Sequence, residues 1–495
     1  MTPRLDYTDR VADIDKCPSS PDGEERLDKI EKTTPWLSVY VAALCSFVQA
    51  LQFGLFFSSL WPYLKRLDPT VNESFFGYVV AIYSLGSCIA SPAFGYWSNR
   101  IKQVRIPTIF GFNMMLLGNL IYLMLDTLPT GQRYAMAVSR VMIGIGSSNA
   151  VLLRTYASTA SVSADRTRSI GCVAAGIAAG LVIGPGLQAL FTPLGEDGLH
   201  LLPGWSLDMY KAPALLAAIV NICGIALMYF VFDETYAGLK DDKEAKELPP
   251  ADLIAVAVCI VTRFTQLSVS TNIETLGSAY SMMMFDLSAP DAVRVNATSQ
   301  AVQGVAAAVI LLPFLFLNIG KRLRQRTVNI ACVLGFIAFH LITYPWGFGN
   351  VGHVTVHPQE SELGGCDVGR FSWCTSTPRV NFWVYYVSLC SVFEVTYAFS
   401  NVVLSTVFSK IIGPRRQGTM QGVFQMSGSI ARMTEPILLN VVYAQFGPRG
   451  VWLVEIGQLL FTLSLWLVFL KRLVPLEKRY PLKDEVEEKR VEAIA

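Results

Sequence analysis

The chain has 495 residues, of which 52% are hydrophobic and only 16% are charged. This balance excludes an ordinary water-soluble domain, in which about a quarter of the residues are charged, and it favours a protein that lies within a lipid bilayer. The formal net charge of +2 gives no reason to expect a nucleic-acid partner.

The N-terminal 35 residues are polar and lack the apolar core of a signal peptide, so we expect a tail over 1–35. From there on the chain repeats apolar runs of about 20 residues, the length that spans ~30 Å of hydrocarbon. These runs predict twelve transmembrane helices, at 36–60, 74–97, 106–126, 134–153, 169–192, 211–233, 251–275, 296–317, 327–346, 380–404, 417–443 and 451–470.

One long polar segment, "DETYAGLKDDKEAKELPP", follows the sixth run and divides the helices into two groups. We therefore predict an all-α membrane protein with an N-terminal six-helix half over 36–233, a linker over 234–250, a C-terminal six-helix half over 251–472 and a tail over 473–495. Lys and Arg concentrate in the tails, the linker and alternate loops such as "NRIKQVR" and "KRLRQR". The positive-inside rule then places both termini in the cytoplasm.

Several predicted helices carry charged residues, and an arginine at a helix centre costs about 2.5 to 3.5 kcal/mol on insertion. Arg140 lies in the fourth span, Glu274 in the seventh and Glu394 in the tenth. We expect Arg140 to contact a substrate or an anion or to act in gating; the alternative is a buried ion pair that fixes helix packing. Arg432 and Glu435 lie three residues apart in the eleventh span, close enough to pair as a structural clamp or to join a site.

Three sequence patterns resemble the motifs of the major facilitator superfamily. They are the loop pattern after the second span, the R-x-x-x-G-x-G pattern of the fourth helix, which includes Arg140, and the glycine–proline pattern of the fifth. The other residues that match them, for which the resemblance implies a role in gating, are Gly95, Asn99, Arg100, Gly144, Gly146, Gly184 and Pro185. Close helix packing is the alternative role for the glycines.

This resemblance implies the major facilitator fold, in which the first, fourth, seventh and tenth helices line a central cavity. Arg140, Glu274 and Glu394 are then expected to converge there, together with Gln49 and Gln52 on one face of the first helix.

Longer segments resemble the lysosomal major-facilitator proteins of the ceroid-lipofuscinosis type, among them "AIYSLGSCIASPAFGYWSN", "FSKIIGPRRQG", "VYAQFGPRG" and "KRLVPLEKRY". The resemblance implies an endolysosomal membrane protein that transports solutes or conducts anions. The chain departs from the superfamily's loop motif at Asn99, where an aspartate is usual. It departs from the narrower group at Met283, where the group has an aspartate, and at Glu435, where it has a glycine. Arg263 and Glu394 are further charges that the resemblance does not lead us to expect. A different substrate or coupling is therefore expected.

The longest loop on the non-cytoplasmic side contains Cys366 and Cys374, and the resembling proteins have a similar pair there. Because this compartment is oxidising during biogenesis, we expect a disulfide. Asn72 and Asn296 begin N-x-S/T sequons on the same side and are candidate glycosylation sites, although both lie close to helix starts. The other cysteines show no metal-binding spacing, so we expect no metal site and no cofactor.

No nucleophile, metal or nucleotide motif is present, and we expect no enzymatic activity. The two halves and the intramembrane charges favour a transporter that moves a small molecule or ion by alternating access, with Glu274 as a proton-coupling site. One alternative is an anion channel of the same fold, in which Arg140 and Arg432 lower the barrier for chloride. Another is a non-transporting scaffold. We expect a monomer in the lipid bilayer.

Overall fold

The computed structural model describes residues 33–56, 59–71, 73–195, 198–202, 205–240, 248–316, 322–347, 352–357 and 364–479. Most of the expected N-terminal tail, the sequon residue Asn72 and the chain beyond residue 479 lie outside the described residues. Within them the secondary structure is almost entirely helical, which confirms the predicted all-α class.

The N-terminal half consists of helices and one short hairpin. Strands β1 (Leu199–Leu202) and β2 (Trp205–Leu207) pair antiparallel, and α6 and α7 together form one span. The helices are α2 (Trp36–Leu55), α3 (Leu60–Leu67), α4 (Glu73–Ile101), α5 (Arg105–Leu123), α6 (Gln132–Gly146), α7 (Asn149–Ala160), α8 (Arg166–Phe191) and α9 (Ala212–Phe230).

The C-terminal half is also helical, and a π-helical turn, η6 (Leu389–Phe393), joins two of its helices into one span. Two-residue strands β3 (Val356–His357) and β4 (Cys366–Asp367) pair in parallel. The helices are α11 (Leu253–Phe285), α12 (Ala289–Phe316), α13 (Gln325–Thr343), α14 (Phe382–Ser388), α15 (Glu394–Ile412), α16 (Gly418–Val468) and α17 (Leu476–Arg479).

Eleven helical stretches of the described chain are long and apolar enough to cross a membrane. The last of them, α16, has 51 residues but is broken at Gly447, whose φ of 68° lies outside the helical range, with Pro448 next to it. This break divides α16 into a first segment before Gly447 and a second segment after it, and both have membrane length. The structure therefore contains the twelve predicted spans.

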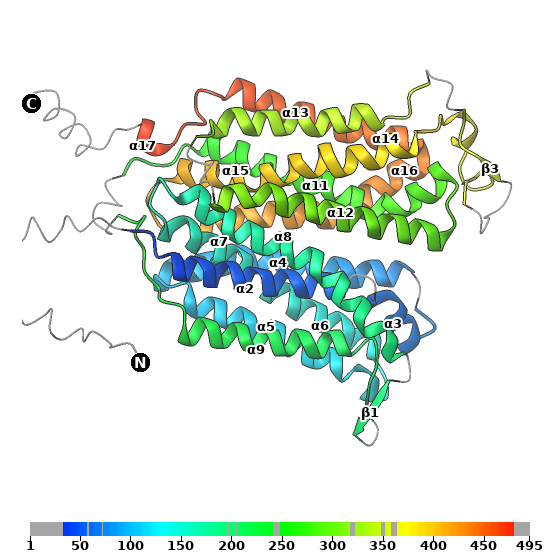
Figure 1. The fold of residues 1–495 in the computed structure, drawn as a ribbon, viewed down its shortest axis with the longest axis horizontal. Coiled ribbons are helices and arrows are strands. Elements are labelled where there is room, and N and C mark those ends of the chain that lie inside the picture. Colours follow the sequence, from blue (N-terminus) through cyan, green and yellow to red (C-terminus); the bar gives the residue numbers. More distant parts are fainter. Residues whose placement is uncertain are drawn as a thin grey trace, which may run out of the picture. The chain divides into compact units, whose positions relative to one another are not determined.

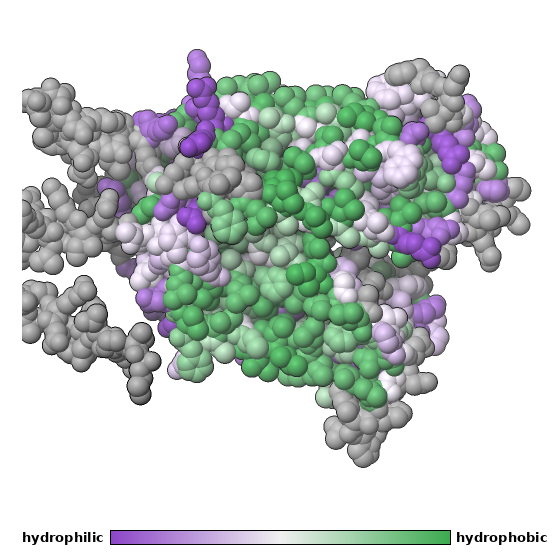
Figure 2. All heavy atoms as spheres, viewed as in Figure 1, coloured by the Kyte–Doolittle hydropathy of each residue, from purple (hydrophilic) through white to green (hydrophobic). Residues whose placement is uncertain are grey.

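The outer surface of the helices is apolar. Large hydrophobic side chains are strongly exposed, for example Phe230 (80%), Val468 (72%) and Trp383 (71%). Figure 2 shows hydrophobic residues in a broad belt across the middle of the molecule and hydrophilic residues gathered towards the two ends of the helices. Because soluble proteins do not leave so large an apolar surface bare, this belt is the surface that faces lipid.

Glycines allow several helices to approach one another closely. A Cβ atom at Gly176, Gly180 or Gly184 of α8 would lie 2.3 to 2.8 Å from carbonyl oxygens of α2. At Gly144 and Gly146 of α6 it would lie 2.3 and 2.4 Å from carbonyl oxygens of α4 and α5. These distances are too short for any side chain, so all five glycines are close-packing positions. Helix α8 continues through Pro185.

Each half has apolar cores of its own. Two clusters contain residues of the N-terminal half alone, and two contain residues of the C-terminal half alone. A small fifth cluster joins the halves, where Leu311 and Val402 pack against Ala174 and Ala178 of α8. Two halves that pack separately and share little core can move as rigid bodies.

The halves are held together at one end of the helices. We call the end that carries α17 the terminal side and the end that carries β1 and β3 the loop side (Figure 1). At the terminal side α4 packs on the first segment of α16, and a Cβ atom on Gly95 would lie 2.1 Å from the carbonyl oxygen of Gly418. Gln325 of α13 donates a hydrogen bond to Thr167 of α8 at 3.0 Å. The terminal side is therefore closed.

Candidate functional site: arginines between the two halves

Arg140 of α6 is a buried cation without an anionic partner in the part of the chain that the structure describes. Its residue is 6% exposed, and its guanidinium carbon lies 4.8 Å from the centroid of the Tyr83 ring in α4. Its buried Nε has no hydrogen-bond acceptor among the described residues. A cation over an aromatic face is stabilised by about 0.5 to 2 kcal/mol, much less than burial of a charge costs. The described partners of Arg140 therefore do not neutralise its charge.

Three further arginines come from α7, α11 and the first segment of α16. Arg154 and Arg263 are 6% and 4% exposed, and Arg432 is half-buried. Their partners are neutral. Arg154 donates to a glutamine of α16 at 3.0 Å and Arg263 donates to Asn401 at 2.7 Å, while the guanidinium of Arg432 lies 5.6 Å from the centroid of the Phe53 ring. None of these partners neutralises a charge.

Two tyrosines connect the four arginines. Tyr397 of α15 interacts electrostatically with the three just described, and Tyr83 interacts in the same way with Arg140 and Arg432. Since α6 and α7 belong to the N-terminal half and α11 and α16 to the C-terminal half, the arginines face one region between the halves. We call these residues the arginine cluster: Arg140, Arg154, Arg263 and Arg432.

Two carboxylates lie beside the arginine cluster. Glu274 of α11 is exposed and interacts electrostatically with Arg432, and it accepts a hydrogen bond from Ser270 at 3.3 Å. Glu394, half-buried at the start of α15, interacts with Glu274. Four arginines against two carboxylates leave the region net positive even when both carboxylates are ionised.

The two glutamines of α2 have different surroundings. Gln49 donates to the backbone carbonyl of Ser147, at the junction of α6 and α7. Gln52 is 1% exposed and faces α5 and α9, where it accepts hydrogen bonds from Asn119 at 3.1 Å and Asn221 at 2.8 Å. The expectation that Gln52 lines the central site is wrong, because amides within the N-terminal half satisfy its side chain.

The predicted clamp between Arg432 and Glu435 is also wrong. Glu435 is 1% exposed and accepts a hydrogen bond from Gln458 of the second segment of α16 at 3.1 Å. Arg432 is directed towards Phe53 instead. Because α16 folds back on itself at its break, the second segment supplies a polar partner that spacing within one helix could not reveal.

Comparison with known proteins identifies the family. Residues 42–356 match the family model of the Major Facilitator Superfamily. The chain belongs to this superfamily. It is 29% identical over 484 residues to major facilitator superfamily domain-containing protein 8 of Xenopus laevis, covering 90% of this chain and 93% of that protein.

Solved structures of other superfamily members share the fold. The human organic anion transporter MFSD10 (TETRAN) has 15% sequence identity and a TM-score of 0.61, and the match covers 87% of this chain and 99% of that one. The major facilitator transporter FucP, solved in an outward conformation, has 13% identity and a TM-score of 0.61 over the same shares of the two chains.

The loop motif of the superfamily lies at the closed terminal side. Asn99 of α4 accepts a hydrogen bond from the backbone N–H of Gly418 at 2.9 Å and donates one to Thr419 at 3.0 Å. Arg100 is exposed and donates within α4. An asparagine supplies both a donor and an acceptor, whereas an aspartate supplies acceptors and a charge. This superfamily member therefore links its halves here through a neutral side chain.

The sequence analysis did not assign four residues of the site to it: Arg154, Arg263, Tyr83 and Tyr397. Arg154 lies one residue past the predicted fourth span, but α7 continues to Ala160 and buries it. Tyr397 carries no charge and gave no signal within its apolar run. The polar stretch "RTYAST" inside a membrane helix is the one feature that could have indicated Arg154.

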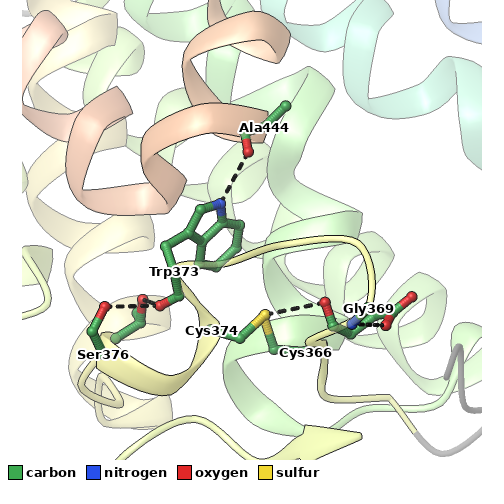
Figure 3. Close-up of a disulfide and its surroundings, with 8 residues drawn as sticks. Cys366, Gly369, Trp373, Cys374, Ser376 and Ala444 are labelled. Carbon is green, nitrogen blue, oxygen red and sulfur yellow. Dashed lines mark hydrogen bonds between the residues drawn. A yellow bond between two sulfur atoms is a disulfide. The ribbon is translucent and has the colours of Figure 1, made fainter. Parts of the chain in front are cut away.

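The loop side of the C-terminal half contains the expected disulfide between Cys366 and Cys374. Trp373, next to it, packs against α16 where Gly447 breaks the helix, and its indole donates to the carbonyl of Ala444 at 3.3 Å (Figure 3). The disulfide therefore fixes a turn whose tryptophan covers the junction of the two α16 segments.

Asn296 is poorly placed to carry a glycan. It lies within α12, and its Oδ1 accepts hydrogen bonds from Ser281 at 3.2 Å and Tyr386 at 3.0 Å. Its Nδ2, the atom that a glycan would modify, is buried. The folded structure therefore argues against glycosylation at this sequon.

Proposed function

We propose that the protein is an endolysosomal secondary transporter that carries a small anionic solute by alternating access. In this proposal the terminal side faces the cytoplasm, because Lys and Arg concentrate in its loops and tails. The endolysosomal location is supported by the resemblance to the ceroid-lipofuscinosis-type proteins and by the 29% identity to the Xenopus relative.

The arginine cluster is the observation that carries this proposal. The Nε atoms of Arg140, Arg263 and Arg432 are buried without an acceptor among the described residues. A guanidinium offers a planar set of donors that matches carboxylate or phosphate. An anion held by arginines of both halves would be exposed to one side and then the other as the halves rock.

Glu274 and Glu394 are the proposed coupling groups. Two interacting carboxylates repel each other when both are ionised, and a proton on either one relieves the repulsion. Glu274 also interacts with Arg432. An anion bound to Arg432 would therefore weaken the electrostatic interaction between Arg432 and Glu274. This favours protonation of Glu274, so that anion and proton move together.

Flux into proteoliposomes tests the activity. A panel of carboxylates, organic phosphates, sulfate and chloride, offered under a pH gradient, should contain an anion whose uptake saturates and shows counterflow. Neutral and cationic solutes of similar size serve as the matched panel. Transport of one of these, with no competition from any anion, would contradict the proposal.

The arginine cluster also favours one second candidate, an anion channel. Buried cations can bind a larger anion, and they also lower the electrostatic barrier to the passage of chloride. Planar-bilayer recording separates the two candidates. Unitary chloride currents without counterflow support the channel, and counterflow without unitary currents supports the carrier.

Imaging of the untagged protein tests the proposed location. Antibody staining should coincide with markers of late endosomes and lysosomes. Staining confined to the plasma membrane would reject the location without bearing on the transport activity.

A further inference from the structure

A second group of ionisable residues lies inside the C-terminal half, away from the arginine cluster. His340 of α13 and Glu455 of the second segment of α16 are both 0% exposed, and the imidazole Nε2 lies 2.8 Å from the carboxyl Oε2. Glu435 of the first segment is 1% exposed and interacts electrostatically with Glu455. The three side chains form one buried polar group, which we call the His–Glu–Glu site.

The hydrogen-bond partners fix where protons lie. Nδ1 of His340 is 2.7 Å from the backbone carbonyl of Phe336, and because a carbonyl only accepts, Nδ1 carries a proton. Nε2 of His340 and Oε2 of Glu455 must then share one proton between them, since two lone pairs would otherwise face each other at 2.8 Å. The carboxyl group of Glu455 also interacts with the side-chain amide of Asn272 in α11.

The neighbouring helices supply few charges to this site. α11 contributes the neutral Asn272, which lies beside Glu455, and α14 contributes the phenol of Tyr385. Arg432 is one turn from Glu435 on α16 but points towards Phe53. Ion pairs from Lys or Arg to either glutamate are absent among the described residues.

Burial of this group of acids favours an additional proton. With the shared proton in place and Glu435 ionised, the His–Glu–Glu site carries a net negative charge in a region that excludes water. An uncompensated buried charge costs several kcal/mol. A proton on Glu435 makes the site neutral without breaking its hydrogen bond, because the other oxygen still accepts from Gln458.

We propose that His340, Glu455 and Glu435 form a proton-binding site in the C-terminal half, separate from the arginine cluster. The site binds and releases one proton at Glu435, and its other proton is the one that His340 and Glu455 share. Full burial means that exchange requires movement of the α16 segments against α11 and α13, which ties proton exchange to the conformational cycle.

The His–Glu–Glu site lies on helices that also carry residues of the central region. Glu435 lies one helical turn from Arg432 on α16, and Asn272 lies two residues from Glu274 on α11. A change of charge at Glu435 therefore acts on helices that carry two central residues.

Spectroscopy on the full-length protein in nanodiscs tests the proposal. The chain has four histidines, so ¹⁵N-histidine labelling yields a small set of imidazole signals, and H340Q identifies the one from His340. Infrared difference spectra report the C=O band of protonated carboxyl groups. Both are recorded over about pH 5 to 8, the range in which histidine charge changes.

We expect the His340 signal and a carboxylic-acid band to change with pH in the wild-type protein. E435Q should lose that band, and E274Q, which alters the central carboxylate, should retain it. The proposal is overturned if the His340 signal is the same throughout the range, or if E435Q keeps the wild-type band. The wild-type titration decides the first point even if a variant fails to fold.

Discussion

Individual arginines within these membrane helices are stabilised by aromatic rings and amides. Tyr83 lies under Arg140, Phe53 under Arg432, and Asn401 accepts from Arg263. Such partners hold a guanidinium in place without neutralising it, and of these three arginines Arg432 also interacts with the carboxylate of Glu274. A buried ion pair would remove that charge, so the proposed anion binding rests on the neutral partners of Arg140 and Arg263.

Substitution of Arg140 by glutamine separates function from packing. R140Q should lower uptake of the transported anion at least about tenfold, equivalent to ~1.4 kcal/mol of lost binding. Thermal stability should be unchanged or higher. The Nε of Arg140 has no hydrogen-bond acceptor among the described residues, so the substitution leaves no acceptor of Nε unpaired. Uptake and unfolding temperature are measured on the same preparation, with R294Q as control, since the Arg294 side chain is 80% exposed. Loss of folded R140Q alone would support the packing role.

Tyr397 provides a milder test of the same site. Y397F removes the hydroxyl that interacts with three arginines of the cluster and keeps the ring. We expect KM for the anion to rise about fivefold, as loss of a hydrogen bond worth ~1 kcal/mol implies. Y78F is the control, because Tyr78 is 69% exposed on the outer face of α4. Equal KM values for the two variants would remove Tyr397 from the site.

At the scale of helices, hydropathy alone predicted the twelve spans, because each apolar run matches the hydrocarbon thickness. The interruptions inside spans were not predictable in this way. These interruptions are the junction of α6 and α7 and the π turn η6, whereas the break at Gly447 lies between the predicted eleventh and twelfth spans. The glycines of α8 gave a clearer signal, and the structure explains them by contact with α2.

Alanine substitution tests the packing of α8 on α2. A Cβ atom at Gly180 would lie 2.5 Å from a carbonyl oxygen of α2, whereas Gly186 in the same helix has no atom within 4 Å of that position. G180A should lower the free energy of unfolding by about 1 to 3 kcal/mol through overpacking. G186A should leave it unchanged or raise it by up to about 1 kcal/mol. Equal unfolding temperatures for the two variants would show that α2 can move away from α8 without loss of stability.

For the whole molecule, the sequence predicted two halves and several of the charges between them, but not how each side chain is oriented. The sequence predicts Gln52 at the centre together with Gln49, and it leaves Glu435 either in a clamp with Arg432 or in a site. The structure directs both into the interior of their own halves, towards Asn221 and Gln458. Spacing along one helix says which residues share a face, and only the neighbouring helices decide what that face meets.

The central carboxylates offer the last prediction, which concerns the transport cycle of the whole molecule. E274Q keeps the shape of Glu274 but fixes it in a neutral state, so protonation can no longer follow anion binding at Arg432. We expect uptake driven by a pH gradient to be lost while exchange of anion between the two sides persists, because exchange needs no net proton movement. Both are measured in the same proteoliposomes, and E394Q is tested beside it because Glu394 interacts with Glu274. Wild-type pH-driven uptake in E274Q, combined with its loss in E394Q, would assign the coupling to Glu394 instead.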